Sequence, residues 1–305
     1  MASRGANLPF LREASVRPPT LRKYRSALAL FSRWAGSRFS PHASADTIDD
    51  LLSEYFHYLY LRHVGRSVAV CTFYALVLYY PRLRSSLAGA AADLRGWARL
   101  APSVSYPPIP FSFVALMAIA LAKSPQYGQR YGFALILAFH CYLRCGELLG
   151  LRACDIVLPE RSSDTVALSL RFTKTGPNQW VTVTSLLVAR CLLRLRSSLA
   201  PRSPLFPFSA SSLRAAFYWA LSQCGIPGDF VLHSLRHGGA TSDFLRGVPI
   251  EDVLHRGRWA SNKSARRYIQ AARAFALTQD ISDSLRSAGY RAACTWHFYI
   301  FSFSR

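Results

Sequence analysis

The stretch HSLRHGGAT, residues 233–241, decides how the rest of the sequence is interpreted. In a helix, His233 and Arg236 are three residues apart and therefore lie on one face. The apolar Leu232 and Leu235 beside them predict a half-buried helix whose polar face lies at the edge of a core. A basic turn on the surface is the alternative. The half-buried pair favours a site for phosphate or another anion, because a guanidinium forks onto such oxygens.

The composition indicates a two-domain globular protein with a polyanionic partner. The chain has 305 residues, of which 51% are hydrophobic, too many for a disordered chain. Lys and Arg number 37 against 16 Asp and Glu, a formal net charge of +21. This excess points most simply to nucleic acid. A membrane surface or an acidic protein is less favoured, because the arginines are spread along the chain instead of gathering in a tail.

The cysteines and the apolar runs indicate in which kind of cellular compartment the protein is expected. Seven cysteines without paired spacing, in a chain without a secretory leader, predict free thiols in a reducing compartment and a protein that is not secreted. Cys141 and Cys145 beside His140 suggest metal ligands, but no second ligand pair follows, and packing is favoured. The apolar runs are too short to cross a bilayer, so we expect a soluble protein with no membrane partner.

The first third of the chain predicts a small, basic, all-helical domain. Residues 1–14 show no periodicity and are expected to form a flexible arm, whereas residues 15–100 are expected to form a helical DNA-binding domain. A capped helix begins at Thr20, and further helices are expected at about 48–64, 67–80 and 87–100. The basic residues Arg22, Lys23 and Arg25 are expected on the outer face of the first helix. The proline-rich segment 101–110 reads as a linker.

A larger domain is predicted over residues 111–288, mainly helical with a small β-sheet. Two alternating stretches, TVALSLRFT and QWVTVT, are separated by KTGPN and predict a hairpin. Residues 289–305 are aromatic and unpatterned and receive no assignment. Helices are expected at 111–123 and 129–150, and again at about 211–224, 234–246, 249–256 and 262–288.

Two further features of this domain, an arginine–glutamate pair and a single lysine, are candidates for chemistry. Arg144 and Glu147 are three residues apart in CYLRCGELLGL, and we expect them on one face of an apolar helix. A simple ion pair within the helix is one interpretation, and an arginine held by the glutamate to bind phosphate is the other. Lys174 lies at the tip of the predicted hairpin, as a solvated lysine or as a mobile proton donor.

The stretch GRWASNKSARRYI, residues 257–269, contains an aromatic pair. Ser261 is expected to cap a helix on which Tyr268 and Ile269 belong to an apolar stripe. Both Trp259 and Tyr268 have a plain interpretation as core aromatics. A helix-turn-helix over residues 249–270 is another possibility. His237, in the opening stretch, is assigned a structural role.

In combination these pieces resemble the tyrosine recombinase (phage integrase) family. LRCGELLGLRACDI resembles its first arginine box, HSLRHGGAT its second, and GRWASNKSARRYI its third, with Arg258 as a departure beside the tryptophan. The resemblance covers residues 111 to about 285, and it identifies the helical N-terminal domain as core-binding-like by architecture. It implies that this domain grips duplex DNA, with Arg22, Lys23 and Arg25 as phosphate contacts. The catalytic set that it implies is Arg144, Lys174, His233, Arg236, Trp259 and Tyr268, with Glu147 supporting the first arginine.

The resemblance implies DNA strand cleavage and rejoining without metal or cofactor. Tyr268 would attack phosphorus to form a 3′-phosphotyrosyl ester, and Lys174 would protonate the leaving 5′-oxygen. Arg144 and Arg236 would clamp the non-bridging oxygens of the transition state. His233 would move the phenolic proton or bind the phosphate. The indole of Trp259 would donate its N–H and form a wall of the site.

The expected partner is double-stranded DNA, on which a homodimer or homotetramer assembles by passing residues 270–288 to a neighbour. A type IB topoisomerase-like nicking and closing enzyme and a catalytically inactive DNA-binding relative are the alternatives. The arginine bias and the tryptophan favour a eukaryotic mobile element. The protein is expected in the nucleus of a eukaryote, or in the cytoplasm of a prokaryote.

Overall fold

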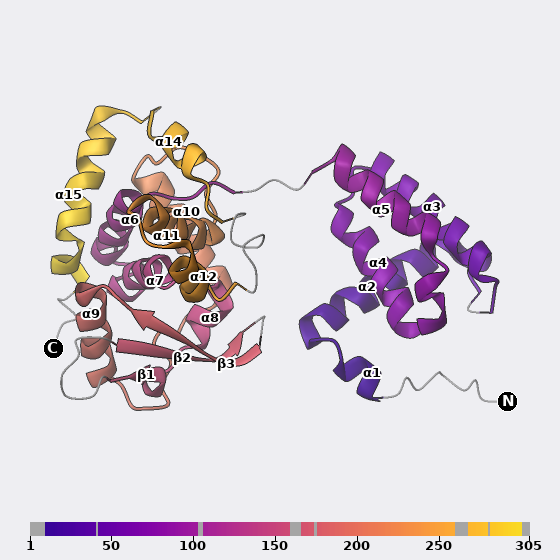
Figure 1. Ribbon diagram of the computed structural model, residues 1–305, viewed down its shortest axis with the longest axis horizontal. Coiled ribbons are helices and arrows are strands. Elements are labelled where there is room, and N and C mark those ends of the chain that lie inside the picture. Colours follow the sequence, from indigo (N-terminus) through magenta and orange to yellow (C-terminus); the bar gives the residue numbers. More distant parts are fainter. Residues whose placement is uncertain are drawn as a thin grey trace. The chain divides into compact units, whose positions relative to one another are not determined.

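The structure is a computed structural model that describes residues 10–40, 42–102, 106–158, 166–173, 176–259, 268–279 and 281–300 (Figure 1). Contacts between residues divide the chain into two compact units, one up to residue 104 and one from residue 105 onward. We call them the N-terminal unit and the C-terminal unit. Within the described ranges, no helix is both long and apolar enough to cross a membrane.

The N-terminal unit is helical in all of its regular elements that the structure describes. Its helices are α1 (Phe10–Ala14), α2 (Pro18–Ala35), α3 (Ala45–Leu61), α4 (Arg66–Tyr79) and α5 (Ala88–Leu100). Helix α2 has prolines in its first turn, where the missing N–H costs nothing. The carboxylate of Asp49 on α3 accepts 2.8 Å bonds from the N–H groups of Gly89 and Ala90, which joins α3 to the start of α5. Part of the stretch predicted as a flexible arm is thus the short helix α1.

The core of the N-terminal unit is aromatic. Phe31, Phe56 and Leu76 from three different helices are closed to solvent, or nearly so. The outer face of α2 carries Arg22, Lys23 and Arg25, which are exposed as expected from their spacing. Arg25 forms an ion pair of 2.8 Å with Glu13.

The C-terminal unit consists of a group of helices with a three-stranded sheet packed at one side (Figure 1). The strands are antiparallel in the order β1-β2-β3, with Leu168 of β2 opposite Ile156 of β1 and Val181 of β3. The strands are β1 (Ile156–Val157), β2 (Val166–Thr173) and β3 (Gly176–Val183). The helices are α6 (Phe111–Lys123), α7 (Gln129–His140), α8 (Cys145–Gly150), α9 (Leu186–Ser197), α10 (Ala210–Gln223), α11 (Leu232–Leu245), α12 (Ile250–Gly257), α14 (Ala271–Gln279) and α15 (Asp283–Ile300).

Helix α11 lies deep in this unit because two glycines let the chain approach closely. A Cβ added to Gly238 would stand 2.1 Å from the carbonyl oxygen of Ile109, and one added to Gly239 would stand 2.1 Å from that of Phe139. No other residue type fits at these distances. The small residues that follow His233 and Arg236 in the sequence therefore press the helix, with its polar face, into the core.

Three expectations about helices are wrong. The predicted helix 129–150 is interrupted after α7, and α8 begins only at Cys145, so Arg144 precedes a helix instead of lying within one. The predicted helix 262–288 is interrupted as well, because residues 268–270 are not helical and α14 ends before α15 begins. Tyr268 therefore lies in a turn and not on a helical stripe; Ser261, its predicted cap, lies outside the described residues.

The C-terminal stretch that received no assignment contains most of helix α15, which packs along α6. The side chains of Trp296 and Ile300 are buried, and Gly289 lies against Ser112 at the start of α6. Its aromatic residues are therefore partly core residues.

Candidate active site

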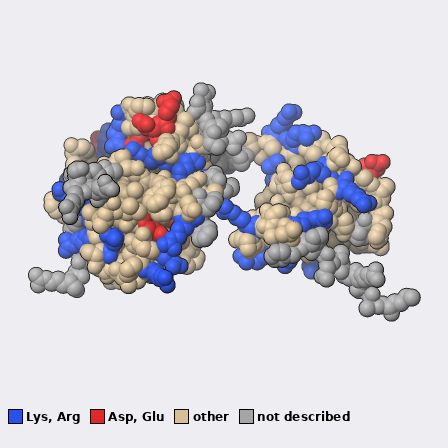
Figure 2. Space-filling model, turned by 60° about the horizontal axis from the view of Figure 1, so that its bottom comes forward, with Lys and Arg blue, Asp and Glu red and all other residues tan. Residues whose placement is uncertain are grey.

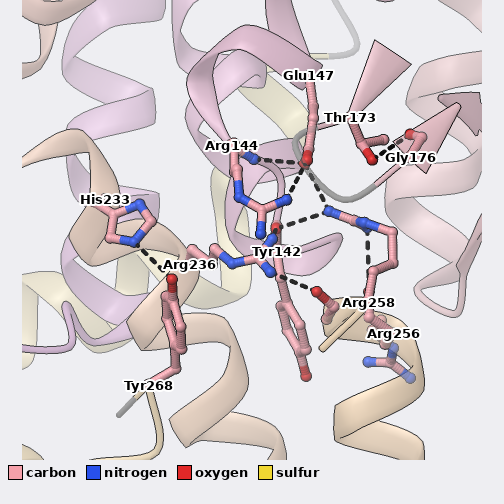
Figure 3. Close-up of polar contacts among 11 residues, drawn as sticks. Tyr142, Arg144, Glu147, Thr173, Gly176, His233, Arg236, Arg256, Arg258 and Tyr268 are labelled. Atoms are coloured by element: carbon pink, nitrogen blue, oxygen red, sulfur yellow. Dashed lines mark hydrogen bonds and ion pairs between the residues drawn. The ribbon is translucent and has the colours of Figure 1, made fainter. Parts of the chain in front are cut away.

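Arg236 is a fully buried arginine on α11, with 0% of its surface exposed. Its two terminal nitrogens donate to the backbone carbonyls of Tyr142 and Gly257 (Figure 3). Its guanidinium carbon lies 4.7 Å from the ring centroid of Trp259 and 5.3 Å from that of Tyr268. The charge is thus held by carbonyl oxygens and by the faces of two aromatic rings.

Arg144 and Arg258 share one carboxylate, that of Glu147. The Nη1 atom of Arg144 lies 2.6 Å from Oε1, and the Nη2 atom of Arg258 lies 2.7 Å from Oε2 (Figure 3). The backbone N–H of Arg144 also donates to Oε2 over 2.9 Å, because Glu147 is the third residue of α8 and reaches back to the start of the helix. Only 3% of the Glu147 side chain and 5% of the Arg258 side chain are exposed, against 20% for Arg144.

The three guanidiniums raise the positive potential of the site. Burial would raise the pKa of Glu147, but Arg258 and Arg144 overcome it and hold that pKa below its ordinary value. Burial, together with the charges of Arg144 and Arg258, lowers the pKa of Arg236. One carboxylate thus faces three guanidiniums, and the surplus charge favours the binding of an anion.

Tyr142 connects the two arginine-bearing segments. Its backbone is left-handed, with φ 47°, and its carbonyl accepts from both Arg236 and Arg258. Its hydroxyl donates to the buried carboxylate of Asp243, and the guanidinium of Arg256 lies 5.7 Å from its ring centroid. Burial, followed by the bond to Asp243, raises the pKa of Tyr142.

The hydroxyl of Tyr268 lies beside the imidazole of His233. The phenolic oxygen is 3.4 Å from Nε2 of His233 (Figure 3). The ring stacks on His237 with centroids 4.6 Å apart and an interplanar angle of 29°. The hydroxyl of Thr241 donates to the Tyr268 carbonyl over 3.0 Å and accepts from the N–H of Gln270 over 3.1 Å. This bridge holds the turn that carries the tyrosine against α11.

Trp259 covers the arginines from the side of α12. Its ring lies 4.8 Å from that of Tyr268 and 6.1 Å from that of Tyr142. A Cβ on Gly257 would stand only 1.9 Å from the indole, so the chain needs a glycine there. Within the described part of the chain, the buried indole N–H has no hydrogen-bond partner.

The structure gathers most of the predicted residues in one cluster. Arg144, His233, Arg236, Trp259 and Tyr268 come together from α11 and from the segments before α8 and after α12. The carboxylate of Glu147 lies between the guanidiniums of Arg144 and Arg258 (Figure 3). Lys174 lies outside the described residues. Among the described residues, no group of three or more His, Cys, Asp or Glu could hold a metal ion.

Two residues of this cluster were not predicted to belong to it. Arg258 was expected only as a departure beside Trp259, without a role, and Tyr142 was not among the predicted site residues. The sequence carries a signal for Arg258. It comes just after the end of a predicted helix, where a left-handed backbone is common and glycine is preferred, so an arginine at this position is unusual. For Tyr142 we find no local signal, since its contacts come from α11 and α12.

Two histidines, the buried His237 and the partly exposed His140, make the stability of this unit dependent on pH. Burial, with smaller contributions from neighbouring charges, lowers the pKa of His140 and of His237 to about 4. In the unfolded chain both titrate near 6.5, so folding releases protons between pH 6.5 and 4. Stability is complete above pH 6.5 and falls as pH decreases. At pH 5 we expect a loss of about 2 kcal/mol for each histidine.

Urea unfolding at pH 7 and pH 5 measures this loss. The variant His237→Gln should show a smaller difference between the two pH values than the unaltered protein. His42→Gln, at an exposed position of the N-terminal unit, is the matched control and should leave the difference unchanged. An equal pH dependence in His237→Gln and the unaltered protein would contradict the interpretation that His237 is buried uncharged.

No family model and no curated protein matches the sequence. Solved structures do match the fold. The Tn1549 transposon integrase, in complex with circular intermediate DNA, is 14% identical with a TM-score of 0.59, over 87% of this chain and 95% of the other. The fold is that of the tyrosine recombinases.

Two other solved structures match this chain over a similar share of its length. A lambda integrase dimer bound to a COC′ core site is 17% identical with a TM-score of 0.59, over 86% of this chain and 92% of the other. The XerH site-specific recombinase, bound to a palindromic difH substrate, is 15% identical with a TM-score of 0.59, over 81% of this chain and 75% of the other. The predicted class, mainly α with a small sheet on the tyrosine recombinase plan, is confirmed.

Proposed function

We propose that this protein cuts and rejoins DNA strands through a covalent 3′-phosphotyrosyl intermediate. The observation that carries the proposal is the position of the Tyr268 hydroxyl, 3.4 Å from His233 Nε2 and beside a cluster of three guanidiniums. A phenol next to an imidazole can lose its proton as it attacks, and the guanidiniums stabilise the charge that develops on the phosphate.

The proposed step balances as a transesterification. The phenolic oxygen of Tyr268 forms a bond to phosphorus while the bond from phosphorus to the 5′-oxygen breaks. His233 accepts the phenolic proton. Lys174, which lies between β2 and β3 in the sequence, supplies a proton to the leaving 5′-oxygen. The phosphodiester energy is kept in the tyrosyl ester, so attack by a 5′-hydroxyl reverses the step.

The hairpin that carries Lys174 lies on the side of Glu147. Helix α8 and strand β2 border a cavity of about 300 Å³ whose lining includes Glu147, Ser169 and Arg171. Thr173 and Gly176, which flank the turn, share a hydrogen bond of 2.7 Å. These contacts of the neighbouring residues support our choice of Lys174 as the proton donor; Lys174 itself lies outside the described residues.

The two predicted arginines take different positions in the proposed site. Arg144 is partly exposed and is open to phosphate, whereas Arg236 is closed to solvent beneath the rings of Trp259 and Tyr268. We propose that direct contact between Arg236 and phosphate follows a movement of these rings when DNA binds. Before such a movement the buried charge of Arg236 acts on the phosphate through space.

Duplex DNA is the proposed partner. Figure 2 shows Lys and Arg side chains over the visible faces of both units, with few acidic ones between them. We include Arg22, Lys23 and Arg25 on α2 as phosphate contacts. A homo-oligomer assembled on DNA and an origin in a eukaryotic mobile element are further parts of the proposal; a reverse transcriptase or flanking repeats beside the gene would support that origin.

The test is the formation of a protein–DNA adduct. A pool of nicked duplexes with randomised sequence is incubated with the protein in the presence of a metal chelator. The adducts that resist denaturant are then captured, and their DNA is sequenced. The nick lets a short 5′ fragment diffuse away, which traps the intermediate. We expect adducts without metal or nucleotide, joined at a 3′-phosphate. Salt-sensitive DNA binding without any adduct would instead favour the inactive DNA-binding relative.

The captured sequences also separate recombination from the topoisomerase-like alternative. A plasmid carrying two copies of the selected sequence should exchange strands between the copies if the protein recombines DNA. Relaxation of a supercoiled plasmid without such exchange would favour the nicking and closing activity.

A further inference from the structure

Arg258 occupies a backbone conformation that disfavours an arginine. Its φ is 55° and its ψ is 42°, the left-handed region, directly after the last residue of α12. Side chains with a Cβ are strained there, and glycine is the residue that fits without cost. The described residues include only three other non-glycine positions with positive φ: His63, Tyr142 and Asn178.

The contacts of Arg258 show what this strained position achieves. Its guanidinium donates to Glu147 over 2.7 Å and to the carbonyl of Tyr142 over 3.3 Å. These two acceptors are also the anchors of the predicted arginines, because Arg144 binds Glu147 and Arg236 binds the Tyr142 carbonyl. One side chain thus joins the anchors of both.

We propose that Arg258 is a positioning residue that sets Arg144 and Arg236 for the phosphate. It acts through Glu147 and Tyr142, and with 5% of its side chain exposed it is too deep to contact duplex DNA itself. By binding Oε2 of the carboxylate, it leaves the guanidinium of Arg144 to bind Oε1, and it adds a positive charge to the cluster. The inference rests on the proposed function, which it extends by one residue.

The charge balance explains why a second arginine on Glu147 matters. An isolated Arg144–Glu147 pair is neutral and would attract a phosphate weakly. With Arg258 the trio carries one positive charge, and Arg236 adds another nearby. An anionic transition state that gains charge is stabilised most where such a surplus is already held in place.

The variant Arg258→Gly separates this role from a structural one. Glycine relieves the left-handed strain, so the fold has no backbone reason to weaken, while the guanidinium is lost. We expect unchanged affinity for DNA and a rate of adduct formation at saturating DNA that falls by about 100-fold, the effect of a small misplacement of catalytic groups. Arg258→Lys keeps the charge and loses the fork, so its rate should lie between the two.

His63→Gly is the matched control. His63 has the same φ of 55°, also just after a helix, but its side chain is exposed and it belongs to the N-terminal unit, whereas the cluster belongs to the C-terminal unit. This variant should relieve the same strain and keep the rate of adduct formation. An Arg258→Gly protein that forms adducts as fast as the unaltered protein would overturn the proposal.

A second measurement keeps the inference apart from the proposed function. If the unaltered protein forms no adduct with any duplex, the proposed function fails, and inorganic orthovanadate then serves as the probe in calorimetry. An affinity at least about tenfold weaker in Arg258→Gly, roughly 1.4 kcal/mol, would still support a positioning role toward a phosphate-like anion. Equal affinity of both proteins, or no binding by either, would overturn it.

Discussion

Replacing Tyr268 by phenylalanine is expected to abolish the protein–DNA adduct completely while DNA affinity and folding stay nearly unchanged. The substitution keeps the ring that stacks on His237 and removes only the phenolic oxygen. That oxygen makes one long hydrogen bond, of 3.4 Å, to His233, so its loss should cost no more than about 1 kcal/mol of stability. The measurement is the nicked-duplex assay, read by denaturing electrophoresis, beside a DNA-binding titration.

Tyr290→Phe is the control for this experiment. Tyr290 lies on α15 with 72% of its surface exposed, and its hydroxyl has no place in the cluster. Tyr142, the other tyrosine of the site, is a poor nucleophile because its hydroxyl is bound to the buried Asp243. If Tyr268→Phe formed adducts as efficiently as the unaltered protein, the assignment of the nucleophile would be wrong, and with it the proposed chemistry.

Regular parts of this fold were predictable because local patterns decide them. Helix α6 has the predicted bounds, since an apolar run interrupted only by Ser112 follows Pro110, which fixes the start of the helix. The hairpin was expected from alternation, although β3 begins at Gly176, inside the predicted turn. The close packing of α11 was visible as small residues in the opening stretch, because glycine at a helix face indicates a close neighbour.

The breaks in the predicted helices depend on distant contacts. The apolar pattern of α7 continues through Leu143, so nothing local ends the helix at His140. The left-handed Tyr142 that follows is held by Asp243, 101 residues later in the chain. Likewise Tyr268 is held in a turn by Thr241 on α11. Periodicity cannot report such partners.

The same distinction holds for the site. Residue types and their order were sufficient to nominate Arg144, Arg236 and Tyr268, which the structure brings together. Arg258 was passed over because its partner Glu147 is 111 residues away. Neither residue predicts the other without the fold. Burial of Arg236 was equally hidden, because it depends on the rings of Trp259 and Tyr268 above it.

Glu147→Gln is expected to have the largest effect on stability among single substitutions at this site. Glutamine keeps the shape of the side chain and removes the negative charge. The guanidiniums of Arg144 and Arg258 then lose the carboxylate between them, with Arg236 close by. Breaking a buried ion pair from one side costs about 3–5 kcal/mol, because the remaining charge is left uncompensated. Urea unfolding of the full chain at neutral pH measures this loss.

The exposed pair of Glu54 and Arg38 supplies the control. Its N–O distance of 2.7 Å equals that of Arg258 and Glu147, but more than half of each side chain is exposed. Glu54→Gln should therefore cost at most about 1 kcal/mol.

The two losses should also differ in their dependence on pH. The arginines hold the pKa of Glu147 below its ordinary value, so its contribution is complete above the unfolded pKa of about 4.3 and disappears as pH falls through the lower folded pKa. The gap between Glu147→Gln and the unaltered protein should narrow in that acidic range. If Glu147→Gln lowered the free energy of unfolding by no more than Glu54→Gln does, the three guanidiniums would not depend on this carboxylate. The shared anchor behind both the proposed site and the role of Arg258 would then be lost.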